Sequence, residues 1–584
     1  MNSFFKIFFA SLLALVVFSI IGFFILIGVA SSIGSRDPIE TGSKAVLVLD
    51  LSIPYSEVAI NNPFAGLTGE ENSDIPSVYD LVRLIHHAVG DSAVKGIYLK
   101  CGINNNSFGT SEDIRNALIK FRNSGKFVYA YADVISQGGY YVANVSNKIF
   151  CNPKGGLDWR GYSMSLFFLK GTLEKLEIEP QIFYAGKFKS ATEPLRETKM
   201  TEANRLQTTE ILNDLYGHFL TQTSAFRKID TATLHGYANA NALQTGSQAV
   251  KAGLLDGLKY DDEVQDEIRS ILRVEKTAKL NLLSVQKYAE AVEIRKTGTD
   301  KIMVIYAQGD IIDGKGERTI IGSESYVNLV RKGRLDKSIK AIVFRINSGG
   351  GSAMASENIW RELSLARKEK PIVVSFGDVA ASGGYYLSCN ADSIFAQPNT
   401  ITGSIGVFSI LPNMQGFFNN KLGITFDGVK TSPDADALSV SKPLTPAQRQ
   451  WIQNDVDSIY ATFIQRVADG RKKDVAFIDS IAQGRIWSGT RALQLGLIDR
   501  IGGLQEAIDC AARMAKTNNY KLREYPEPER LFERFFGRST ENARTSAMRE
   551  EIGEDGMKIY QNLKRVKQMV GVTQTRLPFD FVIE

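Results

Sequence analysis

The sequence predicts an α/β fold made of two related copies that follow an N-terminal membrane helix. Three observations support this. Short apolar runs alternate with longer amphipathic segments along most of the chain. The same residues recur at a separation of 245 positions. Residues 7–30 are apolar or small throughout and carry no charge. Together these features indicate a tethered, duplicated α/β protein.

The N-terminal segment, residues 1–35, is predicted to be a membrane anchor. Its apolar stretch of 24 residues exceeds the roughly 20 that span a bilayer. A secretory signal peptide has an apolar region of only about 7–15 residues, although residues 30–32 are small enough for cleavage. Lys6 and the amino terminus favour a cytoplasmic start. We therefore expect a single-pass protein of the inner (cytoplasmic) membrane, with its remaining domains outside the cytoplasm.

The body of the chain divides into two halves, residues 40–290 and 295–525. A strand is expected at 44–51 in the first half and at 301–307 in the second. Between these starts, Glu112 matches Glu357 at an offset of 245, and residues 253–256 later match 496–499 at 243. The halves therefore differ only by small insertions or deletions.

Within the second half, apolar strands alternate with an amphipathic helix, as α/β layers require. The expected elements are strands at 340–346, 372–376 and 393–396 and helices at 352–368 and from residue 385 to 390. Residues 275–299 serve as a connector with a helix at 285–295. The C-terminal tail, residues 526–584, is charged, with a possible amphipathic helix at 556–569 and no recognisable chemistry.

Composition argues against nucleic-acid and metal chemistry. The net charge of +5 is spread over 69 basic and 64 acidic residues without a long basic run. The cysteines are too far apart for a zinc site, and we expect them to be free and buried. They are Cys101, Cys151, Cys389 and Cys510. No phosphate-binding lysine motif accompanies the glycines at 349–351. No cofactor or metal is expected.

The chain's most informative stretch is residues 378–386, where Ser382 follows an apolar run and precedes a short helical segment. Glycines after the serine allow a sharp turn, and the first N–H groups of the helix face whatever the hydroxyl attacks. The Gly-x-Ser-x-Gly pattern of the α/β-hydrolases is absent. Taken alone, Ser-Gly-Gly is more often a plain turn.

A second motif strengthens the case for catalysis. The glycine run follows a strand and opens a helix, where N–H groups can bind an anion. We predict that Gly350 and Gly351, with Gly383, form an oxyanion hole. At the position of Ser382 the first half has Gln137, and its residues 102–107 lack the glycine run. The first half therefore shares the repeated residues of the second half but lacks the serine and the glycine run.

A serine nucleophile needs a base. The four histidines all lie in the first half and are expected on helix surfaces in structural roles. They are His86, His87, His218 and His235. A lysine can act instead if burial lowers its pKa. The chain has many lysines, so composition does not choose among them.

Four motifs, at residues 186–194, 347–352, 381–385 and 402–406, give the chain a specific resemblance. It resembles the S49 peptidases in their long, duplicated form, the signal peptide peptidase A group. The likeness extends from the anchor to about residue 521. It implies tandem domains of the Clp protease and crotonase type. Gly349 stands where many relatives have proline, a departure that leaves both following glycines in place.

The resemblance also implies residue roles. The nucleophile falls on Ser382, the general base on Lys189 in the first half, and a serine that orients the lysine on Ser404. Lys187 is the alternative base. The active site is then implied to form between the two halves, the first supplying the lysine and the second the serine.

The implied function is that of a membrane-anchored serine endopeptidase with a Ser/Lys dyad, which degrades cleaved signal peptides at the membrane. The implied assembly is a homotetramer, with membrane lipid around the anchor and no nucleic-acid partner. Two rivals stay open. One is a crotonase-like acyl-thioester enzyme, whose fold also uses glycine turns as oxyanion holes. The other is a catalytically inactive membrane scaffold.

Overall fold

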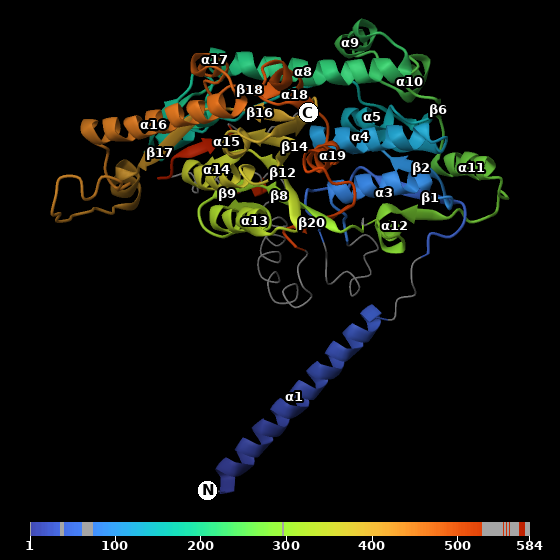
Figure 1. The fold of residues 1–584 in the computed structure, drawn as a ribbon, viewed down its shortest axis with the longest axis horizontal. Coiled ribbons are helices and arrows are strands. Elements are labelled where there is room, and N and C mark those ends of the chain that lie inside the picture. The colour runs from blue at the N-terminus through green and yellow to red at the C-terminus, as the bar shows by residue number, and fades with distance from the viewer. Residues whose placement is uncertain are drawn as a thin grey trace.

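The protein is described by a computed structural model. It describes residues 2–34, 40–60, 74–294, 297–527, 553, 556–557, 560 and 571–577. The α/β class is confirmed: helices pack on largely parallel sheets, and Figure 1 shows the two halves side by side.

The elements of the first half are β1 Ala45–Asp50, α3 Val78–Gly90, β2 Val94–Lys100, α4 Phe108–Asn123, β3 Phe127–Ile135, α5 Gln137–Ala143, β4 Lys148–Leu157, α6 Lys170–Lys175, β5 Glu179–Ala185, η1 Ser190–Thr192, α7 Glu193–Arg196, α8 Glu202–Arg227, α9 Thr231–Asn239, α10 Gly246–Lys251, β6 Gly257–Leu258, α11 Asp261–Leu272, β7 Leu282–Ser284 and α12 Val285–Ala291.

The second half repeats this order with additions. Its elements are β8 Asp300–Gln308, β9 Asp310–Ile312, β10 Gly316–Glu317, β11 Ile320–Gly322, α13 Ser323–Leu335, β12 Ile339–Ser348, β13 Gly350–Ser352, α14 Ala353–Arg367, β14 Ile372–Ala381, α15 Gly383–Ser388, β15 Ser393–Ala396, β16 Ile401–Gly403, β17 Val407–Asn413, η2 Phe417–Leu422, α16 Pro446–Arg471, α17 Val475–Ile481, β18 Ile486–Ser488, α18 Gly489–Gln494, β19 Arg500–Ile501, α19 Leu504–Met514 and β20 Tyr520–Tyr525. A last strand, β21 Gln574–Arg576, follows near the C-terminus.

Each half is built on its own sheet. The first sheet has the order β6-β4-β3-β2-β1-β7, and the second β18-β16-β14-β12-β8-β20. The central strands read as continuous apolar runs because helices cover both faces of a parallel sheet; β12, for example, is buried along most of its length. The connector contributes more than predicted, since β7 adds an edge strand beside β1.

The predicted repeat is confirmed at the level of single hydrogen bonds. The Tyr140 hydroxyl donates to the carbonyl of Leu254 at 2.8 Å, and the Tyr385 hydroxyl donates to that of Leu497 at the same distance. The two tyrosines are 245 residues apart and the two leucines are 243 apart, which are the two offsets found in the sequence. The two halves therefore share one internal frame.

A third sheet joins the halves. Its order is β10-β11-β9-β13-β21-β17-β5, so a strand of the first half, β5, lies at the edge of a sheet otherwise built by the second half and the C-terminal strand. Helix α8 of the first half crosses both halves along one side (Figure 1). Its Asp214 accepts hydrogen bonds from Ser488 and Arg491 of the second half, each at 2.7 Å.

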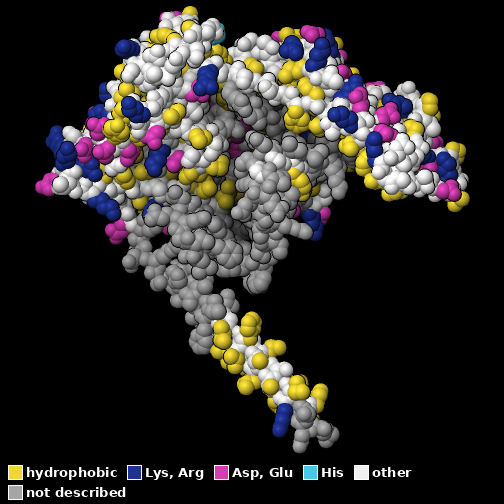
Figure 2. All heavy atoms as spheres, turned by 180° about the vertical axis from the view of Figure 1, so that it is seen from behind, with side chains coloured by type: hydrophobic (Ala, Val, Ile, Leu, Met, Phe, Trp, Pro, Cys, Tyr) yellow, Lys and Arg dark blue, Asp and Glu magenta, His cyan; other side chains and the backbone are white. Residues whose placement is uncertain are grey.

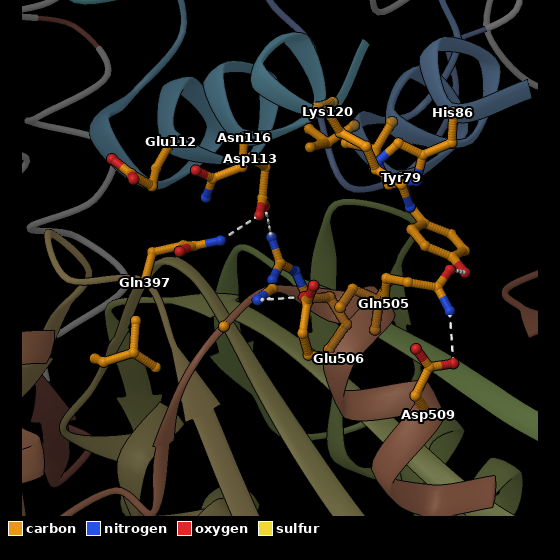
Figure 3. Close-up of a pocket in the computed structure, with 18 of the residues that line it drawn as sticks. Tyr79, His86, Glu112, Asp113, Asn116, Lys120, Gln397, Gln505, Glu506 and Asp509 are labelled. Atoms are coloured by element: carbon orange, nitrogen blue, oxygen red, sulfur yellow. Dashed lines mark hydrogen bonds and ion pairs between the residues drawn. The ribbon is translucent and has the colours of Figure 1, made fainter. Parts of the chain in front are cut away.

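A buried charge cluster also crosses the interface. Arg345 on β12 donates to Glu57 at 2.9 Å and to Asp113 on α4 at 3.2 Å. Burial raises the pKa of Asp113 to about 6 despite the guanidinium. Beside the cluster lies a cavity of about 500 Å³ between α3, α4 and α19, where Figure 3 shows Asp113 facing Gln397. Neither Ser382 nor Lys189 lines this cavity.

Helix α1, Asn2–Gly34, stands away from the body (Figure 1). The side chains that the structure describes on it, residues 4–22, are mostly apolar (Figure 2). Its Phe4–Gly22 segment has a mean hydropathy of 2.5 and is exposed throughout. Among the described residues, this helix alone is long and apolar enough to cross a membrane, which fits the predicted anchor. The side chains of residues 23–30 in the predicted span lie outside the described part.

The remaining predictions concern individual strands and helices and the state of the cysteines. The strands predicted at 44–51, 301–307 and 393–396 and the helix at 352–368 are confirmed within a residue or two. The strand predicted at 372–376 is longer, because β14 continues to Ala381. The four cysteines are free and buried, as predicted. Most of the helix expected at 556–569 lies outside the described residues.

Candidate active site

Ser382 occupies the turn between β14 and α15, as predicted. Its φ of 54° and ψ of −113° are rare for a residue with a side chain. Its N–H donates to the carbonyl of Gly403 at 2.8 Å, and its own carbonyl accepts from Tyr386 at 2.7 Å. The helix begins at Gly383, two residues earlier than expected. The surrounding structure thus holds the serine in a strained turn.

Lys189 reaches this turn from the other half of the chain. Strand β5 pairs antiparallel with β17, which sets Ala185 opposite Val407. The loop after β5 then lies directly beside the loop that precedes β18. A Cβ on Gly484 would stand 2.6–2.7 Å from backbone atoms of Lys189, so this close approach requires glycine.

The lysine and two serines form one contact group. Lys189 Nζ lies 2.8 Å from Ser382 Oγ, 3.0 Å from Ser404 Oγ and 3.1 Å from the Ser404 carbonyl oxygen. Burial places the pKa of Lys189 well below its usual 10.5, because desolvation disfavours the ammonium form. In the described part of the chain no carboxylate forms an ion pair with this lysine. The geometry therefore brings together all three residues predicted for the catalytic group.

Ser404 is also held by its backbone. Its φ is 49°, that of Gly403 before it is 80°, and its N–H donates to the carbonyl of Arg485 at 2.7 Å. Strand β16 ends at Gly403 and pairs with β18. The sheet thus fixes the position from which the Ser404 hydroxyl and carbonyl meet the lysine.

The glycine loop lies against the same turn, with one change from the prediction. The N–H of Gly350 donates to Ser348 Oγ at 3.1 Å, so it is engaged inside the loop and is not an oxyanion donor. Gly350 has a φ of 101°, and a Cβ there would lie 2.7 Å from the nitrogen of Gly383. Because it has no side chain, Gly350 lets the glycine loop approach the backbone of Gly383 closely. Gly351 and Gly383 stay as the candidate donors.

The rival residues lie elsewhere. Lys187 is exposed, and its Nζ lies 5.6 Å from the ring centre of Phe188. Gln137 is bound into the first half, where its side-chain oxygen accepts from Arg160 and Gly161 at 3.1 Å each. Neither residue contacts Ser382.

The histidines are likewise occupied away from the serine. The contacts are His87 with Tyr288 at 2.9 Å and His218 with Glu112 at 3.2 Å, a ring contact of His235 with Tyr216, and a position of His86 on the wall of the interface cavity. Within the described ranges, no group of three or more His, Cys, Asp or Glu side chains is arranged to hold a metal ion.

Sequence analysis missed one element of the site. Strand β21 pairs with β13 on one side and with β17 on the other, so residues 574–576 lie across the glycine loop. The available signal was the alternation of Thr573, Thr575 and Leu577 with other residues, a pattern typical of a strand. Such a short run does not say which sheet it joins.

A serine in a strained turn, within hydrogen-bond reach of a buried lysine, is typical of a serine hydrolase. Comparison with known proteins narrows this class. The model of the family described as "Peptidase family S49" matches twice, at residues 120–275 and 364–518. The chain belongs to peptidase family S49, and it is a peptidase.

Its relatives carry matching names. Protease 4 of Salmonella typhi is 35% identical, over 86% of this chain and 84% of the relative. The chloroplastic serine protease SPPA of Arabidopsis thaliana is 32% identical, over 73% and 64%. A putative signal peptide peptidase SppA of Enterococcus faecium is 34% identical, over 38% and 67%.

Proposed function

We propose that this protein is a serine endopeptidase that works with a Ser/Lys dyad, Ser382 as nucleophile and Lys189 as general base. The observation that carries the proposal is the 2.8 Å contact between the two side chains. It lies in a buried site that favours the neutral amine. Each half of the chain supplies one member of the pair, so the site depends on both.

The geometry supports a two-step reaction. Neutral Lys189 takes the proton from Ser382 Oγ as the oxygen attacks a peptide carbonyl, and the resulting ammonium protonates the leaving amine. A water then releases the acyl group by the reverse proton transfers. The hydroxyl and carbonyl oxygens of Ser404 accept hydrogen bonds from Lys189 Nζ, which keeps the lone pair of the amine aimed at the nucleophile. The N–H groups of Gly351 and Gly383 hold the developing oxyanion.

We further propose that the substrates are peptides in extended form, cleaved signal peptides among them. The printed name of the Enterococcus faecium relative supports this class. Helix α1 would tether the enzyme to the cytoplasmic membrane, with Lys6 on the cytoplasmic side and both halves on the other. A homotetramer, as in the family that the sequence resembles, completes the proposal.

The test pairs two readouts on the same samples, labelling by a fluorophosphonate probe and hydrolysis of a peptide. We expect Ser382→Ala to lose both. Lys189→Ala should lose hydrolysis and slow labelling strongly, whereas the matched change Lys187→Ala should keep both. Hydrolysis that persists in Ser382→Ala would exclude the mechanism. A wild type that neither labels nor hydrolyses would favour the scaffold, and one that processes acyl thioesters without labelling would favour the crotonase alternative.

The pH dependence tests the base. Because the active form of Lys189 is neutral, acylation should be fast above its active-site pKa and should fall as the pH drops through it. That pKa lies well below 10.5, so activity should persist at pH values where an exposed lysine is fully charged. A flat profile from neutral to acidic pH would contradict this assignment.

A further inference from the structure

Lys189 lies at the centre of a tight turn that follows β5. Its φ of −73° and ψ of 77° are those of an inverse γ-turn, a three-residue turn closed by a hydrogen bond between its outer residues. That bond is present, because the N–H of Ser190 donates to the carbonyl of Phe188 at 2.8 Å. The direction in which the lysine side chain leaves the backbone therefore depends on how these three residues are held.

One buried side chain, Gln207 on α8, contacts both outer residues of this turn. Its Nε2 donates to the carbonyl oxygen of Phe188 at 3.0 Å and to Ser190 Oγ at 2.9 Å. Its Oε1 accepts from the N–H of Ile486, the first residue of β18, at 3.4 Å. Gln207 is only 1% exposed, so water does not compete for these bonds. A single amide thus joins α8, the lysine turn and a strand of the second half.

Gln207 is itself oriented by a network of buried polar groups at the start of α8. Its Nε2 also donates to Asn204 Oδ1 at 3.2 Å, and Asn204 Nδ2 donates to the carboxylate of Glu193 at 2.8 Å. Glu193 accepts in addition from the hydroxyl of Thr201, the N-cap residue of α8, at 2.5 Å. The oxygen and the nitrogen of each amide therefore have partners, and a satisfied buried network fixes one arrangement.

The loop before the lysine has a separate attachment that does not involve Gln207. The N–H of Phe188 donates to the carbonyl of Gln483 at 2.7 Å, and the N–H of Lys187 donates to Gln483 Oε1 at 3.3 Å. Strand β5 is also fixed by its pairing with β17. Loss of the Gln207 amide should therefore loosen the turn at Lys189 while the loop stays in place.

We propose that Gln207 is a positioning residue for the general base, which keeps Lys189 Nζ within reach of Ser382 by holding the residues on either side of the lysine. This inference rests on the proposed Ser/Lys dyad. A displacement of about 1 Å at a reacting group can cost about a hundredfold in rate. Gln207 contacts neither the serine nor the amine of the lysine, so its effect passes through the turn.

The same turn keeps the amine of Lys189 away from water. Desolvation is the cause that places its pKa well below 10.5. Of the charged side chains on the surrounding elements, Arg485 pairs with Glu210, and Glu193 belongs to the network at the start of α8. A looser turn that admits water would therefore raise the pKa of Lys189 toward its ordinary value.

The first experiment is Gln207→Met in the full chain, because methionine nearly matches the length of glutamine and has no amide. We expect kcat for a peptide at neutral pH to fall by about 10- to 100-fold. KM should stay within about twofold, because the amide does not bind substrate. Labelling of Ser382 by the fluorophosphonate probe should slow by the same factor as kcat.

The pH profile separates positioning from a general loss of structure. If the pKa of Lys189 rises, the acid limb of the kcat profile moves to higher pH, so the deficit of Gln207→Met should shrink between pH 7 and pH 10. A loss of folded enzyme would lower activity by one factor at every pH. The matched control is Gln222→Met on the same helix, where the side chain accepts from Arg115 at 3.1 Å. It should leave kcat, KM and the profile unchanged.

A second variant tests the route through the turn. Ser190→Ala removes one of the two contacts with the turn and should lower kcat by about three- to tenfold, the worth of one hydrogen bond. Because this serine acts through Gln207, the double variant should lose less than the product of the two single effects. Losses that multiply would mean that the two residues act independently. Should Gln207→Met fail to fold, the milder Ser190→Ala carries the same pH test.

The outcomes distinguish this inference from the dyad itself. If the wild type neither labels nor hydrolyses, or if Lys189→Ala keeps full hydrolysis, the proposed dyad is wrong. If Lys189→Ala loses hydrolysis but Gln207→Met matches the wild type, the dyad stands and the positioning role is wrong. A deficit of Gln207→Met that is equal at all pH values, with less folded protein by thermal unfolding, would likewise overturn the positioning role.

Discussion

The two halves differ most at one turn. In the second half Ser382 precedes α15 with a φ of 54°. In the first half the equivalent Gln137 is already the first residue of helix α5, and Ser136 before it caps the helix in ordinary extended geometry. The first half lacks both the nucleophile and its strain. Backbone strain costs free energy and persists where function requires it.

The two halves also differ in the loop that holds the glycine run in the second half, residues 349–351. Asn104 takes the place of Gly349, and its side chain donates to Ser111 at 2.9 Å and to the carbonyl of Gly138 at 3.1 Å. Gly138 is the counterpart of Gly383. A Cβ on Gly349 would lie 3.4 Å from the Cβ of Leu577, so an amide side chain fills in the first half the space that the segment of β21 takes in the second. The first half instead contributes β5 to the shared sheet and Lys189 to the contact with Ser382.

The largest predicted effect comes from exchanging the two turn residues. A chain with Gln137→Ser and Ser382→Gln should lose peptide hydrolysis by about 10⁴-fold or more. The new serine would meet neither a buried lysine nor a strained turn. Gln137→Ser alone should keep the activity of the parent. Hydrolysis by the exchanged chain would show that the halves are functionally equivalent, against this comparison.

The next effect concerns the interface that holds the halves together. Arg345→Met should lower the free energy of unfolding by about 3–5 kcal/mol, because Glu57 and Asp113 stay buried without their cation. Urea unfolding measures the loss. The control Arg160→Met removes an arginine that is 81% exposed and should change stability by less than about 0.5 kcal/mol. Equal values for the two variants would mean that the cluster does not join the halves.

A smaller effect is expected at the residue that aims the lysine. Ser404→Ala removes one hydrogen bond to Lys189 Nζ and leaves the carbonyl contact. We expect kcat to fall by up to about a hundredfold, because a small misplacement of the base is costly. Ser393→Ala on β15 is the buried-serine control. An unchanged kcat in Ser404→Ala would mean that the Ser404 hydroxyl does not position Lys189.

The smallest effect is a gain in stability. The lowered pKa of Lys189 means that the folded chain holds fewer protons than the unfolded chain below pH 10.5, so stability rises with pH in that window. Lys189→Met should remove this penalty and stabilise the protein by about 1 kcal/mol at neutral pH. Unfolding measured from pH 7 to 10 should show the two stability curves converging. A less stable variant at neutral pH would contradict the assigned direction.

Local sequence patterns predicted much of the fold of this protein. The apolar segment of α1, the central strands and the turn at Ser382 follow from runs of apolar residues, turn glycines and the repeat. The lysine was a different case. One lysine among many has no local signature, and Lys189 was identified only through a family motif. Gly350 was assigned an N–H donor role that Ser348 takes away, a detail of loop conformation that sequence does not display.

By itself, then, the sequence determined that the chain is a tethered, duplicated α/β protein with a serine at a strand-to-helix turn in one copy only. Tertiary structure decided which groups meet that serine. Strand β5 pairs across the halves with β17, and the C-terminal strand joins the same sheet between β17 and β13. The physical reason is that periodicity and turn chemistry act over a few residues. Pairing between distant strands depends instead on edges and pockets that exist only after the chain has folded.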